Sequence, residues 1–187
     1  IPVARYSDML LNPGKNFTFN GQTYQYPNIK LVYWAGGNPF HHQMNLSKLR
    51  KATFKPDTII TNEIWWNSLA RHADIIFPTT TTLERNDIGF RHWEQTVSPM
   101  HKAIDPIGNS RNDFDIFSLI SEKLGIKEQF TENKNEEEWL KTLWDEAKES
   151  ARENNFYLPD FDQFWNGGFF EVLKPTHEQI LMEDFVK

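Results

Sequence analysis

Three short apolar runs, at residues 30–35, 58–61 and 74–77, alternate with two segments of helical spacing, at residues 43–54 and 65–73. Short runs rich in apolar and β-branched residues are typical of buried strands, whereas apolar residues three and four positions apart are typical of helices. Strands that alternate with helices form parallel sheets, because each helix carries the chain back across the sheet. The sequence therefore predicts an α/β fold, with a Rossmann-like parallel sheet and flanking helices.

The segments outside this pattern carry other signals. Aromatic and polar residues alternate around Asn20-Gly21, a dipeptide that favours a type I′ turn, so we expect an N-terminal β-hairpin. Residues 113–124 and 136–154 have helical spacing, and the second segment places its tryptophans on one apolar stripe. The stretch at 86–106 is rich in loop-forming residues, and beyond Phe156 we expect an irregular aromatic extension.

Charge and cysteine content exclude several classes of function. The net charge is −6 and the Lys and Arg residues are scattered, which argues against a nucleic-acid partner. Without cysteine the sequence has no disulfide, no thiolate metal ligand and no thiol nucleophile. It contains no apolar stretch long enough for a membrane span and no signal-peptide pattern. A start at Ile1 in place of Met indicates a fragment of a longer polypeptide.

The turn Gly36-Gly37-Asn38-Pro39 directly follows the first predicted strand. Glycine allows the backbone to approach a ligand closely, and the Asn38 amide offers both a donor and an acceptor. A glycine pair before Asn-Pro also forms ordinary turns, and this motif is neither a Rossmann nor a P-loop fingerprint. His41 and His42 come next, and adjacent histidines without a third ligand are more typical of hydrogen-bonding groups than of a metal site.

Asn62 and Glu63 stand at the carboxyl end of the second predicted strand, where open α/β sheets bind their ligands. An acidic residue in this place can accept hydrogen bonds from ribose hydroxyls, or it can lie in a solvated turn. Nearby, Arg71, His72 and Asp74 invite a catalytic interpretation, but an ion pair at a helix end is the simpler explanation. We therefore predict no catalytic residue in this region.

Two further candidates lie beyond the third predicted strand. Thr79–Thr82 with Arg85 could hold a pyrophosphate, because a guanidinium group makes paired hydrogen bonds with phosphate oxygens. The alternative is that these threonines only form caps and turns. Asp113 opens the next helical segment and could serve as its N-cap. Its two carboxylate oxygens also match the N1–H and N2–H₂ donors of guanine.

Several of these motifs occur in the same order in a known family. The motifs are Ile1–Arg5, the Asn20-Gly21 hairpin, Val32–His42, Ala70–Ile75 and Thr82–Asp87. Together they resemble the molybdopterin oxidoreductases of the dimethyl sulfoxide, trimethylamine N-oxide and biotin sulfoxide reductase group. The similarity is densest from Ile1 to about Leu124 and is thinner afterwards.

The resemblance implies an internal fragment of a larger S- or N-oxide reductase that carries a molybdenum bis(molybdopterin guanine dinucleotide). It places Asn38, Asn62, Glu63, Arg85 and Asp113 at cofactor-binding positions, together with His42 or its neighbour His41. The molybdenum ligand is expected upstream of Ile1, so no catalytic or metal-binding residue is assigned and the isolated chain is predicted to be inactive. The implied partners are the remaining domains of the parent enzyme and an electron donor such as a c-type cytochrome or a reductase.

The resemblance also implies a domain organisation. We expect an N-terminal segment with the hairpin at 1–28, an α/β cofactor-binding domain at 29–130, and a helical and loop extension at 131–187. It favours a periplasmic parent enzyme and leaves a cytoplasmic one open. The alternative is a non-catalytic α/β module that binds a nucleotide or a protein through exposed C-terminal aromatics, namely Phe164, Trp165, Phe169 and Phe170.

Overall fold

The computed structural model of this chain describes residues 1–90, 96–172 and 185. Its contacts divide the chain into two compact units, and each is described separately below. The first unit comprises Ile1–Thr81 and Pro106–Ile120, and the second comprises Thr82–Asp105 and Ser121–Lys187. The three-part organisation expected from the sequence, with boundaries after residues 28 and 130, stays a prediction.

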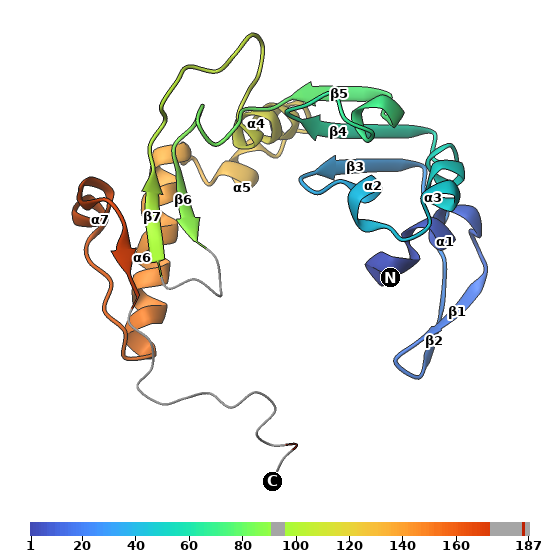
Figure 1. Cartoon of the computed structure of the whole chain (residues 1–187), viewed down its shortest axis with the longest axis horizontal. Coiled ribbons are helices and arrows are strands. Elements are labelled where there is room, and N and C mark those ends of the chain that lie inside the picture. The colour runs from blue at the N-terminus through green and yellow to red at the C-terminus, as the bar shows by residue number, and fades with distance from the viewer. Residues whose placement is uncertain (91–95, 173–184, 186–187) are drawn as a thin grey trace. The chain divides into compact units, whose positions relative to one another are not determined.

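A three-stranded parallel sheet forms the centre of the first unit, in the order β3 (Leu31–Ala35), β4 (Thr58–Glu63) and β5 (Ile75–Pro78). The three arrows in Figure 1 lie side by side and point the same way. The helix α3 (Leu46–Thr53) connects β3 to β4 and buries Leu49 and Ala52 completely. The predicted α/β fold with a parallel sheet and flanking helices is confirmed.

The segment at 65–73 was expected to be a helix, and this prediction is wrong. The structure has turns there and a single 3₁₀ turn, η2 (Ala70–His72). The Asn67 side chain accepts a hydrogen bond from Ala70 N at 3.0 Å, so a polar side chain closes the turn in place of a helical ladder. Asp74, which directly precedes β5, accepts a hydrogen bond from Ile59 N of β4 through its Oδ2 at 2.7 Å. Its carboxylate therefore links the two strands, whereas the sequence suggested an ion pair with Arg71.

The N-terminal part of the first unit contains η1 (Val3–Arg5), α1 (Tyr6–Leu11) and the hairpin β1 (Asn16–Phe19) and β2 (Gln22–Gln25). The two strands pair in antiparallel register. Asn20 and Gly21 have φ values of 49° and 74°, as a type I′ turn requires. The predicted hairpin is therefore confirmed.

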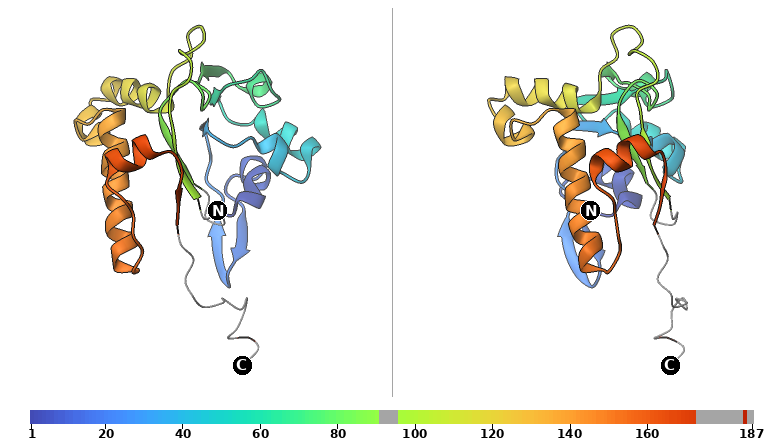
Figure 2. Two further views of the ribbon diagram at one scale, coloured as in Figure 1. Left: turned by 60° about the vertical axis from the view of Figure 1, so that its left-hand side comes forward. Right: turned by 90° about the vertical axis from the view of Figure 1, so that its left-hand side faces the viewer.

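The second unit has a small antiparallel sheet, in which β7 (Thr96–Met100) lies between β6 (Asp87–Phe90) and β8 (Phe170–Glu171). Its helices are α5 (Lys127–Thr131), α6 (Glu136–Glu153) and α7 (Phe161–Gly167). Figure 2 shows α6 and α7 beside β7. The helix predicted at 136–154 is confirmed, whereas β6 and β7 occupy a stretch that was expected to be mostly loop.

The core of the second unit contains Val97, Trp144, Leu158 and Phe164. Trp144 and Phe164 stack with ring centroids 3.7 Å apart, and Trp144 Nε1 donates to the carbonyl of Pro159 at 2.9 Å. Phe164 is only 2% exposed, so the expectation that it belongs to an exposed C-terminal aromatic surface is wrong. The reason is that α7 turns this side chain onto the tryptophan stripe of α6.

The helix α4 (Asp113–Lys123) begins in the first unit. There the ring of Phe117 packs against Tyr33 of β3, with centroids 5.3 Å apart, so α4 covers one face of the parallel sheet. This confirms the helical segment predicted at 113–124. No helix in the described part of the chain is long and apolar enough to cross a lipid bilayer.

Candidate functional site

The carboxyl end of β3 leads into a turn of two glycines with φ values of 84° and 70° at Gly36 and Gly37. Asn38 follows, with 7% of its surface exposed, and its Oδ1 accepts from Phe40 N at 3.0 Å to cap the short helix α2 (Pro39–His42). The other half of the same amide, Nδ2, is buried and has no hydrogen-bond partner among the residues that the structure describes. Buried donors are almost always paired in folded proteins, so this atom is a candidate donor to a ligand acceptor.

Asn62 lies near the end of β4 and is held on both sides of its amide group. Its Oδ1 accepts from the hydroxyl of Tyr33 at 2.7 Å, and its Nδ2 donates to Asp113 Oδ1 at 2.6 Å. Only 6% of the Asn62 surface is exposed. The three side chains come from β3, β4 and α4, and they form one connected polar group, which we call the Tyr33–Asn62–Asp113 relay.

The chain before α4 is fixed to the end of β5 by main-chain hydrogen bonds. Arg111 N donates to Pro78 O, and Thr80 N donates to Arg111 O, both at 3.1 Å. These bonds bring Asp113 to the carboxyl edge of the sheet although it is 51 positions from Asn62. The sequence also suggested Asp113 as a helix cap, but Asn112 Oδ1 accepts from Phe114 N at 2.9 Å. This side chain caps the helix start, so the Asp113 carboxylate is available for other contacts.

Tyr33 is the member of the relay that the sequence did not single out. Burial raises the pKa of its hydroxyl and the negative charge of Asp113 raises it further, while the hydrogen bond with Asn62 has the opposite effect. Tyr33 therefore keeps its proton at neutral pH and acts as a donor. A tyrosine within an apolar strand looks like an ordinary core residue, and only the cross-strand contact reveals its polar role.

The structure places Glu63 and the two histidines at the same edge of the sheet. Glu63 is the last residue of β4, and its carbonyl accepts from Thr79 N at 3.1 Å. Because neighbouring side chains in a strand point to opposite faces, Glu63 and Asn62 face different sides of the sheet. His41 and His42 form the last turn of α2 and are both exposed.

Arg85 belongs to the second unit and is not among the residues that the first unit brings together. Its Nε and Nη2 donate to Asp87 Oδ2 at 3.2 and 3.0 Å. In the described structure this guanidinium therefore forms an ion pair with a carboxylate of β6. Its predicted contact with a cofactor stays a prediction.

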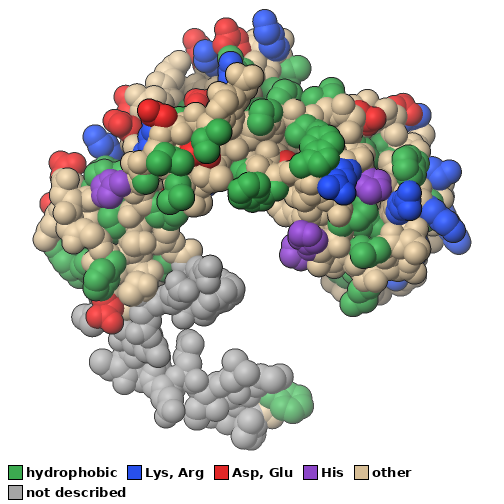
Figure 3. All heavy atoms as spheres, turned by 45° about the horizontal axis from the view of Figure 1, so that its top comes forward, with side chains coloured by type: hydrophobic (Ala, Val, Ile, Leu, Met, Phe, Trp, Pro, Cys, Tyr) green, Lys and Arg blue, Asp and Glu red, His purple; other side chains and the backbone are tan. Residues whose placement is uncertain are grey.

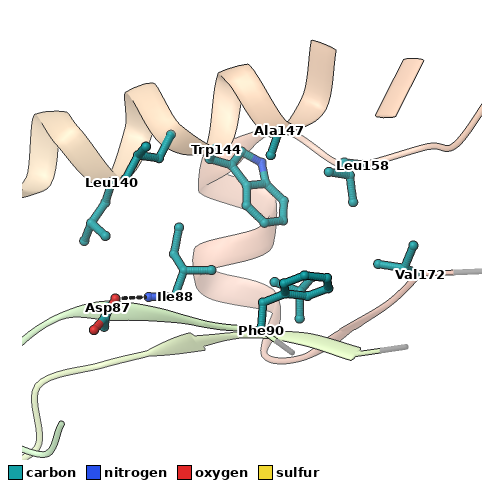
Figure 4. A pocket seen from close by; sticks show the side chains of 10 residues that line it. Asp87, Ile88, Phe90, Leu140, Trp144, Ala147, Leu158 and Val172 are labelled. Carbon is teal, nitrogen blue, oxygen red and sulfur yellow. Dashed lines mark hydrogen bonds between the residues drawn. The ribbon is translucent and has the colours of Figure 1, made fainter. Parts of the chain in front are cut away.

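The second unit contains an apolar cavity of about 380 Å³ between its sheet and α6. Side chains such as Ile88, Leu140, Trp144 and Val172 point into it (Figure 4). The carboxylate of Asp87 at its rim already accepts from Ile88 N at 2.8 Å and from Arg85. A phosphate or a guanine base would lose its water here without gaining hydrogen bonds, so this cavity does not suit a nucleotide.

Donors and acceptors at the carboxyl ends of parallel strands define the first unit as an α/β domain of the kind that binds its ligand at that edge. A family model described as molybdopterin oxidoreductase matches residues 3–123. The chain belongs to the molybdopterin oxidoreductase family.

Several reductases are similar to this chain over most of its length. Biotin sulfoxide reductase of Cereibacter sphaeroides is 44% identical over 90% of this chain, which covers 23% of that protein. Trimethylamine-N-oxide reductase of Haemophilus influenzae is 45% identical over 88% of this chain and 20% of that protein. Trimethylamine-N-oxide reductase 1 of Escherichia coli is 37% identical over 97% of this chain and 22% of that protein. The chain thus spans about a fifth of each of these relatives.

A solved structure gives the same fold. Acetylene hydratase from Pelobacter acetylenicus superposes with a TM-score of 0.60 over 80% of this chain and 19% of that protein, with 15% sequence identity. At this level of identity the match supports the fold alone. The family membership implies a molybdopterin–molybdenum cofactor, and the buried Nδ2 of Asn38 and the Asp113 carboxylate provide a donor and an acceptor that fit such a polar ligand.

Proposed function

We propose that this chain forms part of a molybdenum-dependent S- or N-oxide reductase, and that its first unit binds the nucleotide end of a molybdopterin guanine dinucleotide. The relatives named above act on S- or N-oxides according to their names, and the family uses molybdopterin. The observation that carries the nucleotide assignment is the Asn62–Asp113 hydrogen bond of 2.6 Å, which fixes a carboxylate at the carboxyl edge of the sheet.

Asp113 is our candidate for recognition of guanine. A carboxylate has about four acceptor positions on its two oxygens, and Asn62 uses one of them. The remaining positions suit the N1–H and N2–H₂ donors of guanine, whereas adenine has no N–H at N1. Asp113 is also the first residue of α4, where the helix dipole favours a negative charge. A carboxylate in this place therefore favours guanine over adenine.

The other candidate residues suit different parts of the cofactor. The Asn38 Nδ2 would donate to a cofactor acceptor, and this contact would satisfy its buried hydrogens. Glu63 would accept from ribose hydroxyls, and His42 or His41 would donate to a phosphate or a base. Asn62 keeps one amide hydrogen and one carbonyl lone pair for a direct contact. Arg85 would contact the pyrophosphate in the parent enzyme.

When bound, the molybdenum cofactor would supply the oxygen-transfer chemistry, in which an S- or N-oxide takes up two electrons and two protons and its oxygen leaves as water. The residues of this chain would hold the nucleotide end and would not touch the reacting oxygen. We further propose that the parent enzyme is periplasmic and receives electrons from a c-type cytochrome or a reductase. By itself, the 187-residue chain should not turn over an S- or N-oxide with reduced viologen as electron donor, and turnover would contradict the proposal.

Calorimetry of the purified chain with GDP and ATP tests the nucleotide assignment. We expect weak binding that favours GDP, and a loss of GDP affinity of about tenfold or more in Asp113→Asn, because a charged acceptor is replaced by a group that also carries hydrogens. Asp115→Asn is the matched control, since Asp115 is exposed in the first turn of the same helix. Equal binding of both nucleotides, or tighter binding of ATP, would contradict guanine recognition.

The alternative function, a non-catalytic binding module, has one observation in its favour. Trp65, Trp66 and Phe169 are 70%, 66% and 72% exposed. Figure 3 likewise shows hydrophobic side chains among the charged ones on the surface. Exposed aromatic side chains are typical of protein interfaces. A chain that binds no nucleotide in calorimetry would favour this alternative.

A further inference from the structure

The Tyr33 hydroxyl reaches across to the neighbouring strand. Tyr33 is opposite Ile60 in the β3–β4 register, and Asn62 lies two positions further along β4, on the same face of the sheet as Ile60. This placement allows the hydroxyl to bond Asn62 Oδ1 at 2.7 Å. The same amide then bonds Asp113 through Nδ2. Tyr33 of β3 therefore hydrogen-bonds Asn62 of β4, and Asn62 in turn hydrogen-bonds Asp113, the first residue of α4.

The relay has only one chemically consistent direction. A carboxylate accepts and cannot donate, so Asn62 must turn its Nδ2 toward Asp113. The Oδ1 of Asn62 then faces Tyr33, and the tyrosine must donate its proton. The opposite orientation of the amide would place a carbonyl oxygen against the carboxylate. The Tyr33 hydroxyl and Asp113 thus fix the Asn62 amide in one orientation from its two ends.

The ring of Tyr33 is itself held in place. It packs against the rings of Phe77 and Phe117, with centroids 6.4 and 5.3 Å away. Phe77 comes from β5 and Phe117 from α4, the helix whose first residue is Asp113, so two further elements of the first unit pack against the ring. A phenylalanine at this position would keep this packing and would remove only the hydroxyl.

We propose that Tyr33 is a positioning residue that sets the orientation of the Asp113 carboxylate for guanine recognition, acting through Asn62. This inference rests on the proposed function, because it assumes that Asp113 accepts hydrogen bonds from guanine. Tyr33 itself does not touch the nucleotide. Its effect is to hold the acceptor in the place where both guanine donors reach it.

The test compares GDP with IDP, whose hypoxanthine base lacks the N2 amino group. A well-oriented carboxylate accepts from both N1–H and N2–H₂ and therefore binds GDP more tightly than IDP. In Tyr33→Phe we expect GDP affinity to fall about tenfold, the usual effect of removing one buried hydrogen bond, with a smaller fall for IDP. The preference for GDP over IDP should therefore shrink. If Tyr33 had a purely structural role, its substitution would lower the affinities for GDP and IDP by the same factor.

Tyr24→Phe is the matched control. The Tyr24 hydroxyl donates to Gln22 Oε1 at 2.6 Å within the exposed hairpin, so this variant also loses one tyrosine hydroxyl. We expect it to leave both affinities unchanged. If Tyr33→Phe does not fold, Asn62→Leu has nearly the same size, cuts the relay at its centre, and must reduce the preference for GDP in the same way.

The outcomes separate the two proposals. Asp113→Asn could lose its affinity for GDP while Tyr33→Phe keeps the full preference for GDP over IDP. In that case the positioning role of Tyr33 is wrong and the proposed function stands. If the unmodified chain does not bind GDP, both proposals are wrong.

The side-chain amide signals of Asn62 in a ¹⁵N NMR spectrum report on the relay without any nucleotide. They should move in Tyr33→Phe and not in Tyr24→Phe, and an unchanged signal would overturn the relay itself.

Discussion

The Nδ2 of Asn62 donates to Oδ1 of Asp113 at 2.6 Å, and this bond joins the end of β4 to the start of α4. The two residues are far apart in the sequence, yet they share the edge of the sheet where α/β proteins bind ligands. The bond uses part of the carboxylate and orients the rest. The candidate guanine site therefore depends on how the chain folds around the sheet.

The Tyr33 hydroxyl should report on the charge of Asp113. Burial and the Asp113 carboxylate both raise the Tyr33 pKa, so deprotonation is harder in the folded chain than in the unfolded chain. The associated stability is present below the ordinary tyrosine pKa and is lost as pH rises toward the raised value. In Asp113→Asn we expect the Tyr33 pKa to fall, but only in part, because burial is the larger cause.

NMR titration of ¹³C-labelled tyrosine measures this shift. Tyr6 is an internal control. Burial raises its pKa and a contact with Trp34 lowers it, and Asp113 is not among the causes of the shift. The Tyr6 titration should be the same in the Asp113→Asn variant. An unchanged Tyr33 titration would mean that the carboxylate does not act on the relay.

The two glycines after β3 should be sensitive to substitution through their backbone alone. At Gly37 the φ value is 70°, and an added Cβ would meet no atom of the described residues within 4 Å. Gly37→Ala should therefore lower the free energy of unfolding by about 1 kcal/mol through left-handed strain and without any clash. Gly167→Ala is the control, because Gly167 ends α7, has no left-handed φ and also has open space. Urea denaturation in which Gly167→Ala is the more harmful change would refute this explanation.

The stacked pair in the second unit should dominate its stability. Phe164 is 2% exposed and stacks on Trp144, so Phe164→Ala should cost about 3–5 kcal/mol. Phe169→Ala removes the same side chain from a position that is 72% exposed and should change stability by less than about 0.5 kcal/mol. Thermal unfolding of both variants provides the comparison. Equal losses would show that the C-terminal aromatics are not divided into core and surface in this way.

The parallel sheet could be predicted because its strands are continuous apolar runs and the helix between the first two has a clear period. The strands β6 and β7 were missed because Gly89 and Pro99 weaken any strand pattern. At Gly89 a Cβ would lie 3.0 Å from the Sδ of Met100 and 3.0 Å from the Oγ of Ser98 on the paired strand, so a larger residue would require these side chains to shift. Such close approach depends on tertiary pairing and leaves little trace in the local sequence.

The candidate site, like the fold, could be predicted only in part from the sequence. Placement at strand ends indicated Asn38 and the pair Asn62 and Glu63 before any resemblance was considered, because the carboxyl edge follows from strand order. The role of Tyr33 could not be predicted, since a tyrosine within an apolar strand gives the same signal whether or not its hydroxyl has a partner. Its partner is set by the β3–β4 register, which the sequence does not specify.

Chemical-shift mapping with GDP tests the central claim most directly. On titration of the ¹⁵N-labelled chain, the largest changes should fall on the backbone and side-chain amides of Asn38 and Asn62 and on the backbone amides of Glu63 and Asp113. Changes centred on the apolar cavity of the second unit, at Leu140 and Trp144, or an unchanged spectrum at saturating GDP, would contradict a guanine nucleotide site at the carboxyl edge of the parallel sheet.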